Sequence, residues 1–568
     1  MSSARSLVSL TLSNSSYRSP KASIPRQTAG AAILLRRLSI CHSSLTSSLT
    51  PPPVVNGSGA PQLQKMAFPE ERREYLIEKT TQKLQTSTEQ VKLIDHIQRL
   101  GIGYHWEDMI DAVLQLQCSA FSAEEDLFTT ALRFRLLRQA GFHVSTDVLL
   151  KFKDENGKFK ESLSDDNVGL LSLYEASNMR AQGEEILEEA MEFAERSLLE
   201  GEERVSDEVG RALEVPSHMR MARLEARRFI EEYGNRSDHD RDILELAILD
   251  YNHVQAQHQA ELTELARWWK QLGLVEKLRF GRDRPLECFL WTVGLLPNPK
   301  YSTCRIQLAK TIAILLVIDD IFDTYGKMDE LILFTNAIRR WDLEAMETLP
   351  EYMKICYMAL YNTTNDICYI VLKDTGRTVL PYLKATWIDM IEGFMVEAKW
   401  FNGGNAPNLE EYIENGVSTA GAYMALVHLF FLIGEGVTDQ NASLLRQKPY
   451  PKVFSAAGRI LRLWDDLGTA KEEQERGDLA SGIPLFMKEN NLATEEAARS
   501  GMLEEIFQLW KDLNGELINN NTMPLSIIKV VLNMARASQV IYNHQQRTYS
   551  LSVDNYVQAL FFTPIPSS

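Results

Sequence analysis

The chain lacks several features that define common protein classes. Its 568 residues include only six cysteines and no C-x-x-C pair, so neither a zinc site nor a disulfide framework is expected. No apolar run approaches the ~18–20 residues that span a bilayer, so no membrane contact is expected. Runs with the alternating polar and apolar pattern of strands are also missing. These absences favour a helical globular protein with reduced thiols.

Acidic residues are missing from the first 69 positions. Residues 1–69 contain fifteen serines and seven Lys or Arg, and the first acidic residue is Glu70. This composition is typical of an organelle transit peptide, and the apolar core of a secretory signal is absent. We predict that residues 1–69 are a disordered, cleaved plastid transit peptide that directs the protein to the chloroplast stroma; a merely disordered tail is the alternative. Without those seven positive charges the formal charge falls from −17 to −24, so nucleic acid is not an expected partner.

Helical periodicity dominates from Glu70 onward. Segments such as "AEEDLFTTALRFRLLRQAGF" place apolar residues at i, i+3, i+4 and i+7, which predicts amphipathic helices and an all-α fold. Residues 70–270 are acidic and poor in reactive groups, whereas residues 271–568 are more apolar and hold clustered carboxylates and arginines. We therefore predict two helical domains that meet near residue 270, of which the second carries the chemistry.

A long apolar run ends in clustered carboxylates. In "AILLVIDDIFDTYG", residues 313–326, the run meets Asp319, Asp320 and Asp323. On a helix Asp319 and Asp323 share a face, where like charges repel, and burial of an ionised carboxylate without a partner costs several kcal/mol. A divalent cation that prefers oxygen resolves this conflict, and Mg²⁺ binds carboxylates while keeping waters that a phosphate can replace.

A second helix end repeats this pattern. In "LRLWDDLGTAKEE", residues 461–473, Asp465, Thr469 and Glu473 stand at i, i+4 and i+8. They offer hard oxygen ligands and no imidazole or thiolate. If the two helices face each other, both groups would hold metal ions at the mouth of an apolar pocket. The alternative is an acidic helix end favoured only by solvation.

Arginines that suit a phosphate lie near both groups. "FGRDRPLE" places Arg282 and Arg284 in one loop, and Arg462 precedes Asp465 by three residues. Guanidinium groups bind phosphate oxygens bidentately, and metals with arginines on a diphosphate would favour ionisation of its C–O bond. Surface ion pairs with Asp283 and Glu287 are the alternative for the first two arginines.

Aromatic and weak helix-forming residues complete the predicted pocket. A carbocation needs a dry, aromatic container, because ring faces stabilise cations. Trp291, Tyr542 and Tyr549 are the candidate rings, and the alternative, which is the more common role for any one such residue, is ordinary core packing. "NGVSTAGAYMAL" places Thr419 and Gly421 inside a helical pattern, which predicts a helix break at the cavity.

The motifs resemble those of plant class I terpene synthases. "DDIFD", "DDLGTAKEE" and the "RDR" motif 35–37 residues before the aspartates carry the likeness, and "TALRFRLLRQAGFHVSTDV" and "GLLSLYEAS" resemble the family's N-terminal domain. The resemblance implies a C-terminal class I terpenoid synthase bundle and a largely non-catalytic N-terminal domain, a relic (α/α) barrel. It also implies a monomer that acts on geranyl diphosphate or farnesyl diphosphate with three Mg²⁺ ions, or with Mn²⁺ in their place.

The resemblance implies a role for each site residue. The catalytic residues would be Asp319, Asp320 and Asp323, and the metal ligands would be Asp319, Asp323, Asp465, Thr469 and Glu473. Diphosphate would contact Arg282, Arg284 and Arg462 together with Asp319, Asp323 and Asp465. The pocket would be lined by Trp291, Thr419, Gly421, Tyr542 and Tyr549.

Departures from the family pattern bear on the product. Cyclising members carry a tandem arginine, then eight intervening residues and a tryptophan; here Arg72 and Arg73 are present, but Gln82 stands at the tryptophan position. No D-x-D-D motif occurs, so protonation-initiated cyclisation is not expected. "LECFLWTVGLLPNPKYSTCRI" most resembles the branch that makes acyclic alcohols. We predict linalool from geranyl diphosphate and nerolidol from farnesyl diphosphate. The alternatives are a myrcene or ocimene synthase, a cyclic monoterpene synthase, a chain-elongating prenyltransferase and a binding protein without activity.

Overall fold

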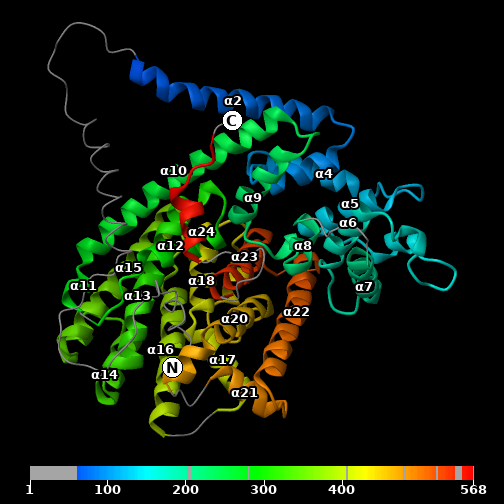
Figure 1. Cartoon of the computed structure of the whole chain (residues 1–568). Coiled ribbons are helices and arrows are strands. Elements are labelled where there is room, and N and C mark those ends of the chain that lie inside the picture. The colour runs from blue at the N-terminus through cyan, green and yellow to red at the C-terminus, as the bar shows by residue number, and fades with distance from the viewer. Residues whose placement is uncertain are drawn as a thin grey trace, which may run out of the picture.

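The structure is a computed structural model that describes residues 61–200, 207–278, 280–403, 407–476, 481–519, 522–543 and 553–566. Throughout these ranges the regular elements are helices (Figure 1), and the one β-bridge joins Lys153 to Phe159. The predicted all-α fold is therefore confirmed. Apolar residues on helical spacing form these elements because they bury one face of each helix against its neighbours.

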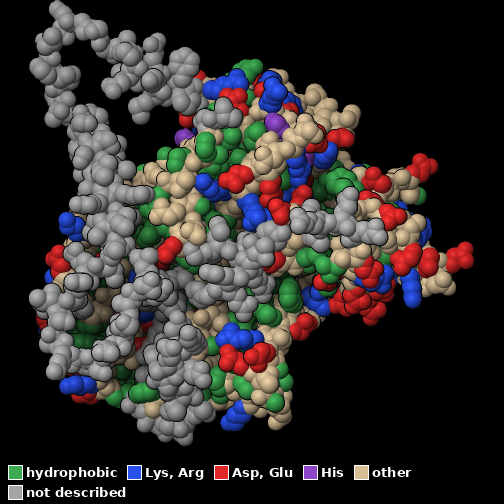
Figure 2. Space-filling model, viewed as in Figure 1, with side chains coloured by type: hydrophobic (Ala, Val, Ile, Leu, Met, Phe, Trp, Pro, Cys, Tyr) green, Lys and Arg blue, Asp and Glu red, His purple; other side chains and the backbone are tan. Residues whose placement is uncertain are grey.

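The N-terminal half is a group of mostly short helices. They are α2 (Pro61–Thr86), α3 (Gln90–Arg99), η1 (Gly103–Trp106), α4 (Glu107–Gln117), α5 (Leu127–Gln139), η2 (Thr146–Phe152), η3 (Glu161–Leu163), α6 (Asn167–Ser177), α7 (Glu185–Glu200), α8 (Asp207–Glu214), η4 (Ser217–Met219) and α9 (Ala222–Asn235). Helix α6 packs against both α5 and α7. On α7, Leu187, Ala190 and Phe193 are buried, and acidic side chains gather on the outer surface in the α7 region (Figure 2). The acidic, amphipathic pattern of this half thus reflects solvated helix faces.

The C-terminal half is a larger helical bundle. It contains α11 (Leu274–Lys277), α12 (Pro285–Leu295), η5 (Pro299–Tyr301), α13 (Ser302–Asp320), η6 (Ile321–Tyr325), α14 (Met328–Arg340), η7 (Glu344–Thr348), α15 (Glu351–Thr375), α16 (Leu380–Gly403), α17 (Leu409–Thr419), α18 (Ala422–Ile433), α19 (Asp439–Ser443), α20 (Lys452–Arg476), α21 (Gly482–Glu489), α22 (Glu495–Asn519), α23 (Leu525–Tyr542), α24 (Val553–Val557) and η8 (Gln558–Phe562). Helix α18 packs against α13, α20 and α23, and α12 packs against α13 and α23. These five helices surround the candidate site.

One long helix joins the two halves. Helix α10 (Arg241–Leu272) lies beside α2 and also contacts α12, α13 and η8 (Figure 1). Its Tyr251 belongs to the N-terminal core, whereas Leu265 and Trp269 belong to the C-terminal core. The described C-terminal residues return to this helix, where the backbone N–H of Ile565 donates to the side chain of Asn252 at 2.8 Å. Because α10 serves both cores, the exact boundary near residue 270 stays a prediction.

The predicted transit peptide lies mostly outside the described residues. Residues 1–60 are not described, and α2 begins at Pro61. The last nine positions of the predicted segment 1–69 therefore have a helical backbone. Where the transit peptide ends stays a prediction.

One stretch is longer and more apolar than we expected from the sequence. Residues Leu409–Ile433 are long and apolar enough to cross a membrane by length and composition, but 89% of the most apolar window is buried inside the structure. The stretch forms the pair α17 and α18, which the break at Gly421 separates. The expectation that no segment reaches this length and hydropathy was wrong. Helices at the centre of the bundle are covered by neighbours on all sides, so their sequences are apolar all round.

Candidate functional site

The first aspartate group stands at the buried end of α13. Asp319 is 1% and Asp320 is 8% exposed, and the helix then continues as η6, which has π-helical hydrogen bonding from Ile321 to Tyr325. The sequence analysis placed Asp319 and Asp323 on one face of an α-helix. Residues four apart remain about one turn apart across such a widened turn, which is a frequent feature of functional sites. Asp319 and Asp323 therefore stay on nearby parts of one surface.

Arg282 closes on this group from the segment between α11 and α12. Its guanidinium forms an ion pair with Asp319, and its Nε lies 2.7 Å from Asp320 Oδ1. Its backbone N–H also donates to Asp320 Oδ2 at 3.1 Å, and its Nη2 donates to the carbonyl of Leu316 at 3.1 Å. Burial raises the pKa of Asp320 to about 6 even though Arg282 opposes the shift. Arg282 thus supplies the positive charge that offsets the two buried carboxylates, Asp319 and Asp320.

The second group repeats this arrangement within α20. Arg462 is fully buried; its Nη1 lies 2.8 Å from Asp465 Oδ2, and its Nη2 forms an ion pair with Asp466. Burial alone would lower the pKa of Arg462, but Asp465 and Asp466 outweigh it and raise that pKa well above its usual value. Tyr412 of α17 donates to Asp466 Oδ1 at 2.8 Å. The Thr469 hydroxyl donates to the Asp465 carbonyl at 2.8 Å.

Two residues of this second group were not predicted. Asp466 and Tyr412 surround Arg462, and the doublet "DD", which also occurs at Asp319 and Asp320, was the available signal for Asp466. No sequence signal pointed to Tyr412, because it lies on another helix 54 residues away. The backbone of Glu473 belongs to α20, but its side chain lies outside the described residues.

Both groups have the donor chemistry of a hard cation. Carboxylate and hydroxyl oxygens are the ligands that Mg²⁺ accepts. Within the described side chains no three carboxylate, imidazole or thiol groups converge on one point to form a finished metal cage. Instead an arginine bridges each aspartate doublet. A cation would have to share or replace these arginine contacts.

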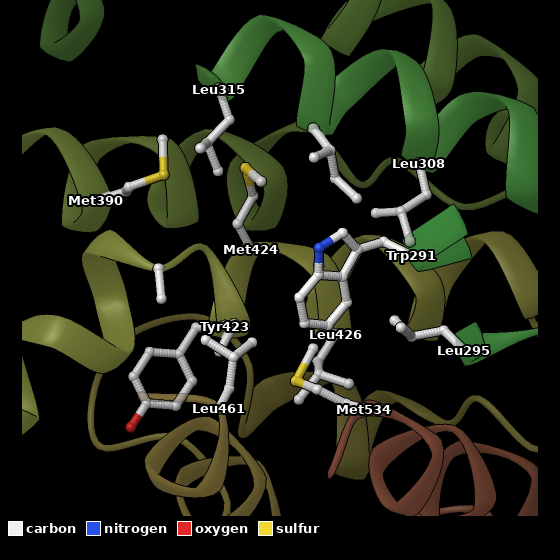
Figure 3. Packing of buried hydrophobic residues seen from close by; sticks show 14 of the residues in the cluster. Trp291, Leu295, Leu308, Leu315, Met390, Tyr423, Met424, Leu426, Leu461 and Met534 are labelled. Carbon is white, nitrogen blue, oxygen red and sulfur yellow. The ribbon is translucent and has the colours of Figure 1, made fainter. Parts of the chain in front are cut away.

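An apolar cavity lies between α12, α13, α18, α20 and α23. It has a volume of about 30 Å³, and its walls include the predicted residues Trp291, Gly421 and Tyr542. The Trp291 indole lies among leucine and methionine side chains such as Met424 and Met534 (Figure 3). Its ring centroid is 5.9 Å from that of Tyr542. Among the described residues no acceptor lies within hydrogen-bonding distance of its Nε1. The residues that line the cavity are therefore apolar or aromatic, with the Tyr542 hydroxyl and the Trp291 N–H as their polar side-chain groups.

The predicted helix break occurs at the cavity wall. Helix α17 ends at Thr419, and Gly421 adopts φ +77°, where a Cβ atom would come within 2.6 Å of Leu315 Cδ1. Glycine is required there both by the left-handed backbone and by the close approach. The Thr419 hydroxyl instead donates to Glu397 Oε1 at 2.8 Å, and Thr419 is not among the residues that line the cavity.

The positions of two other predicted residues leave their roles as predictions. Arg284 lies 3.1 Å from Glu287 in an i, i+3 ion pair, which matches the alternative of local ion pairing. The neighbouring Asp283 accepts a hydrogen bond from Trp269 Nε1 at 2.9 Å. Tyr549 lies outside the described residues. A role for Arg284 on diphosphate remains a prediction.

The structure thus combines a two-domain helical fold, arginine-bridged aspartates and an apolar cavity with aromatic walls. Two family models match the chain. "Terpene synthase family, metal binding domain" covers residues 270–512, and "Terpene synthase, N-terminal domain" covers residues 56–214. The chain belongs to the terpene synthase family, as its motifs predicted.

Similar proteins come from plants. A chloroplastic geraniol synthase from Ocimum basilicum is 70% identical over 96% of this chain and 98% of its own length. A chloroplastic R-linalool synthase from the same species is 67% identical over 97% of this chain and 98% of its own length.

Among solved structures, isoprene synthase from Populus x canescens in complex with three Mg²⁺ ions and dimethylallyl-S-thiolodiphosphate matches with a TM-score of 0.82. It is 37% identical, and the match covers 88% of this chain and 98% of that chain. The neighbour confirms the fold, and the metal-binding family model supports use of a divalent metal.

Proposed function

We propose that this protein is a plastid monoterpene synthase that converts geranyl diphosphate into an acyclic monoterpene alcohol. The observation that carries the proposal is the pair of arginine-bridged aspartate groups, on α13 and α20, in a bundle whose apolar cavity is lined by Trp291 and Tyr542. Charged groups that bind diphosphate and an apolar container for the chain are the two requirements of this chemistry. The chloroplastic relatives that make geraniol and linalool support the substrate and the compartment.

Each group has a defined task in the proposed mechanism. Asp319, Asp323, Asp465, Thr469 and Glu473 would hold Mg²⁺, which supplies Lewis acidity to the leaving diphosphate. Arg282 would turn from the aspartates to the diphosphate oxygens, for which a guanidinium fork is suited, and Arg462 would bind them while it stays paired within α20. The arginines thereby stabilise the negative charge that develops as the C–O bond breaks. Asp320 would hold Arg282 near the rim.

The cavity would receive the cationic chain. Pockets that bind small molecules usually offer about 300–1,000 Å³, so the cavity of about 30 Å³ has to widen for a ten-carbon substrate. Met424 and Met534 line it, and unbranched methionine side chains adapt readily to such a change. The ring faces of Trp291 and Tyr542 stabilise the allylic cation.

The position of water attack decides the alcohol. The allylic cation shares its charge between C1 and C3, so water at C3 gives linalool and water at C1 gives geraniol. The absent tryptophan of the arginine motif, with Gln82 in its place, favours early capture by water over ring closure. We propose linalool as the main product, with myrcene or ocimene from deprotonation as minor products. Geraniol is the second candidate, because the geraniol synthase relative is 70% identical.

One assay separates these products. The purified protein is incubated with geranyl diphosphate and Mg²⁺ in ¹⁸O-labelled water, and the volatiles are identified by gas chromatography with mass spectrometry. Labelled linalool supports attack at C3, and labelled geraniol moves the attack to C1. Limonene or cineole as the main product would refute early capture by water. Farnesyl diphosphate in the same assay is expected to give nerolidol.

The compartment has an independent test. A fluorescent reporter fused to residues 1–69 is expected to accumulate in plastids, because this segment has the composition of a transit peptide. A reporter fused to residues 70–200 serves as the control and should remain outside plastids. A diffuse signal from the first fusion would refute the plastid assignment and favour the C15 substrate.

A further inference from the structure

Three aromatic rings join the arginine segment to the aspartate segment. Phe280 stacks on Tyr325 with ring centroids 3.9 Å apart and an interplanar angle of 17°. The ring of Tyr352, at the start of α15, stands edge-on to both, at 5.0 Å from Tyr325 and 5.9 Å from Phe280. We name these three residues the aromatic clasp. Phe280 precedes Arg282 by two residues, and Tyr325 follows Asp323 by two.

The aromatic clasp lies at the surface of the bundle. Tyr325 is 52% exposed, and Phe280 and Tyr352 are partly buried. The half-exposed ring of Tyr325 contributes little to the hydrophobic core, whereas Phe280 and Tyr352 also pack against the core of the bundle. The base of the clasp is fixed, because Tyr352 donates from its hydroxyl to Glu330 Oε2 at 2.8 Å, and Glu330 accepts the backbone N–H of Lys327 at the start of α14.

The segment that carries Arg282 is held by a few local contacts, among them the Gly281 N–H on the Leu278 carbonyl and Trp269 on Asp283. Helix α11 ends at Lys277 and α12 begins at Pro285, so Phe280 and Arg282 belong to an irregular connection. The side chain of Arg282 is held by ion pairs with Asp319 and Asp320 and by the Leu316 carbonyl. If Arg282 turns toward a diphosphate, it gives up these contacts. The stacking of Phe280 on Tyr325 does not involve charge and persists through that change.

We propose that Phe280 and Tyr325 are positioning residues that keep the Arg282 segment at the rim while Arg282 exchanges aspartate contacts for diphosphate contacts. The inference rests on the proposed function, in which Arg282 binds diphosphate. The pair lowers the loss of backbone freedom that binding otherwise requires, because the segment is already ordered. Loss of the stacking therefore weakens capture of diphosphate and leaves the bond-breaking step nearly unchanged.

The test compares four variants with a matched control. Phe280→Leu, Tyr325→Leu and the double variant remove the stacking, whereas Tyr325→Phe keeps the ring. Tyr369→Leu is the control, since Tyr369 is another exposed tyrosine, 67% exposed, on α15. Each protein is assayed with geranyl diphosphate and Mg²⁺. Its affinity for inorganic diphosphate with Mg²⁺ is measured by calorimetry, and its thermal unfolding is followed by circular dichroism.

The expected result is a split between KM and kcat. Each leucine variant should raise KM and weaken inorganic diphosphate binding by about 3- to 10-fold, the range for one aromatic pair, with kcat within about twofold of wild type. The double variant should be no worse than either single variant, because both remove one interaction. Tyr325→Phe and Tyr369→Leu should resemble wild type.

Other outcomes overturn the proposal. Unchanged KM and diphosphate affinity with a lower unfolding temperature would show that the aromatic clasp only stabilises the fold. If the KM increases of the two single variants multiplied in the double variant, the two rings would act separately. If wild type binds inorganic diphosphate but does not turn over geranyl diphosphate, the proposed function fails and the calorimetric comparison still decides the role of the clasp. If wild type binds no diphosphate, both fail.

Discussion

The aspartate groups of α13 and α20 are bridged by arginines in two different ways. On α20, Arg462 precedes Asp465 and Asp466 by three and four residues on one helix, and its side chain is fully buried. On α13, the bridge to Asp319 is made by Arg282, which comes from an irregular connection 37 residues earlier and is 14% exposed at its side chain. The first bridge is local and rigid. The second depends on how a surface segment is held, so it is the more adaptable half of the site.

The largest expected effect comes from removal of either aspartate group. Asp319→Ala and Asp465→Ala should each lower turnover of geranyl diphosphate about 100- to 1,000-fold or more, because each removes electrostatic support for the leaving group. Turnover is measured by gas chromatography of the volatiles. Leu116→Ala, at a 75% exposed position on α4, is the control and should keep wild-type turnover. Wild-type turnover in either aspartate variant would refute the metal assignment for that helix.

A chelator should abolish activity reversibly. The proposed ligands are hard oxygen atoms, so added Mg²⁺ should restore turnover after EDTA treatment and dialysis, and Mn²⁺ is expected to substitute. The measurement is the initial rate against free metal concentration. Recovery with Zn²⁺ alone would contradict the hard-ligand assignment of both groups.

The two arginines should differ in their effect on stability. Arg462→Ala leaves Asp465 and Asp466 buried without their guanidinium, and breaking a buried pair costs about 3–5 kcal/mol in the free energy of unfolding. Arg282→Ala should cost less, because its group lies nearer the surface. Chemical denaturation of both variants against wild type measures this difference. Equal losses would contradict the contrast between a rigid and an adaptable bridge.

The same contrast bears on the stability of the aspartate variants. Repulsion between clustered carboxylates alone would make removal of Asp465 nearly neutral for stability. In the structure Asp465 pairs with the fully buried Arg462. Asp465→Ala should therefore lower the unfolding temperature more than Asp319→Ala, because the partner of Asp319, Arg282, lies nearer the surface.

The smallest expected effect is that of a conservative change in the adaptable bridge. Arg282→Lys keeps the positive charge but loses the fork that binds two oxygens, so KM for geranyl diphosphate should rise about 10-fold with kcat nearly unchanged. Arg284→Lys is the matched control from the same segment, because Arg284 pairs with Glu287 instead. Steady-state kinetics check both variants. If Arg284→Lys raised KM as much, Arg284 would share the diphosphate role that the sequence assigned to it.

Local sequence patterns are sufficient to predict the helices and the part of the site that lies within a single helix. Apolar spacing fixed an all-α fold, and the i, i+3 relation of Arg462 to Asp465 places two groups on one helix face whatever surrounds them. The break near Gly421 was also predictable from local sequence, because glycine and serine are weak helix formers.

Contacts between residues that are far apart in the sequence depend on the tertiary structure. It placed Arg282 on Asp319, Tyr412 on Asp466 and the Thr419 hydroxyl on Glu397. It also stacked Phe280 on Tyr325. These pairs lie 22 to 54 residues apart. No local periodicity relates them, because the geometry of a single helix fixes contacts only three or four residues away, and all longer contacts depend on how the helices pack.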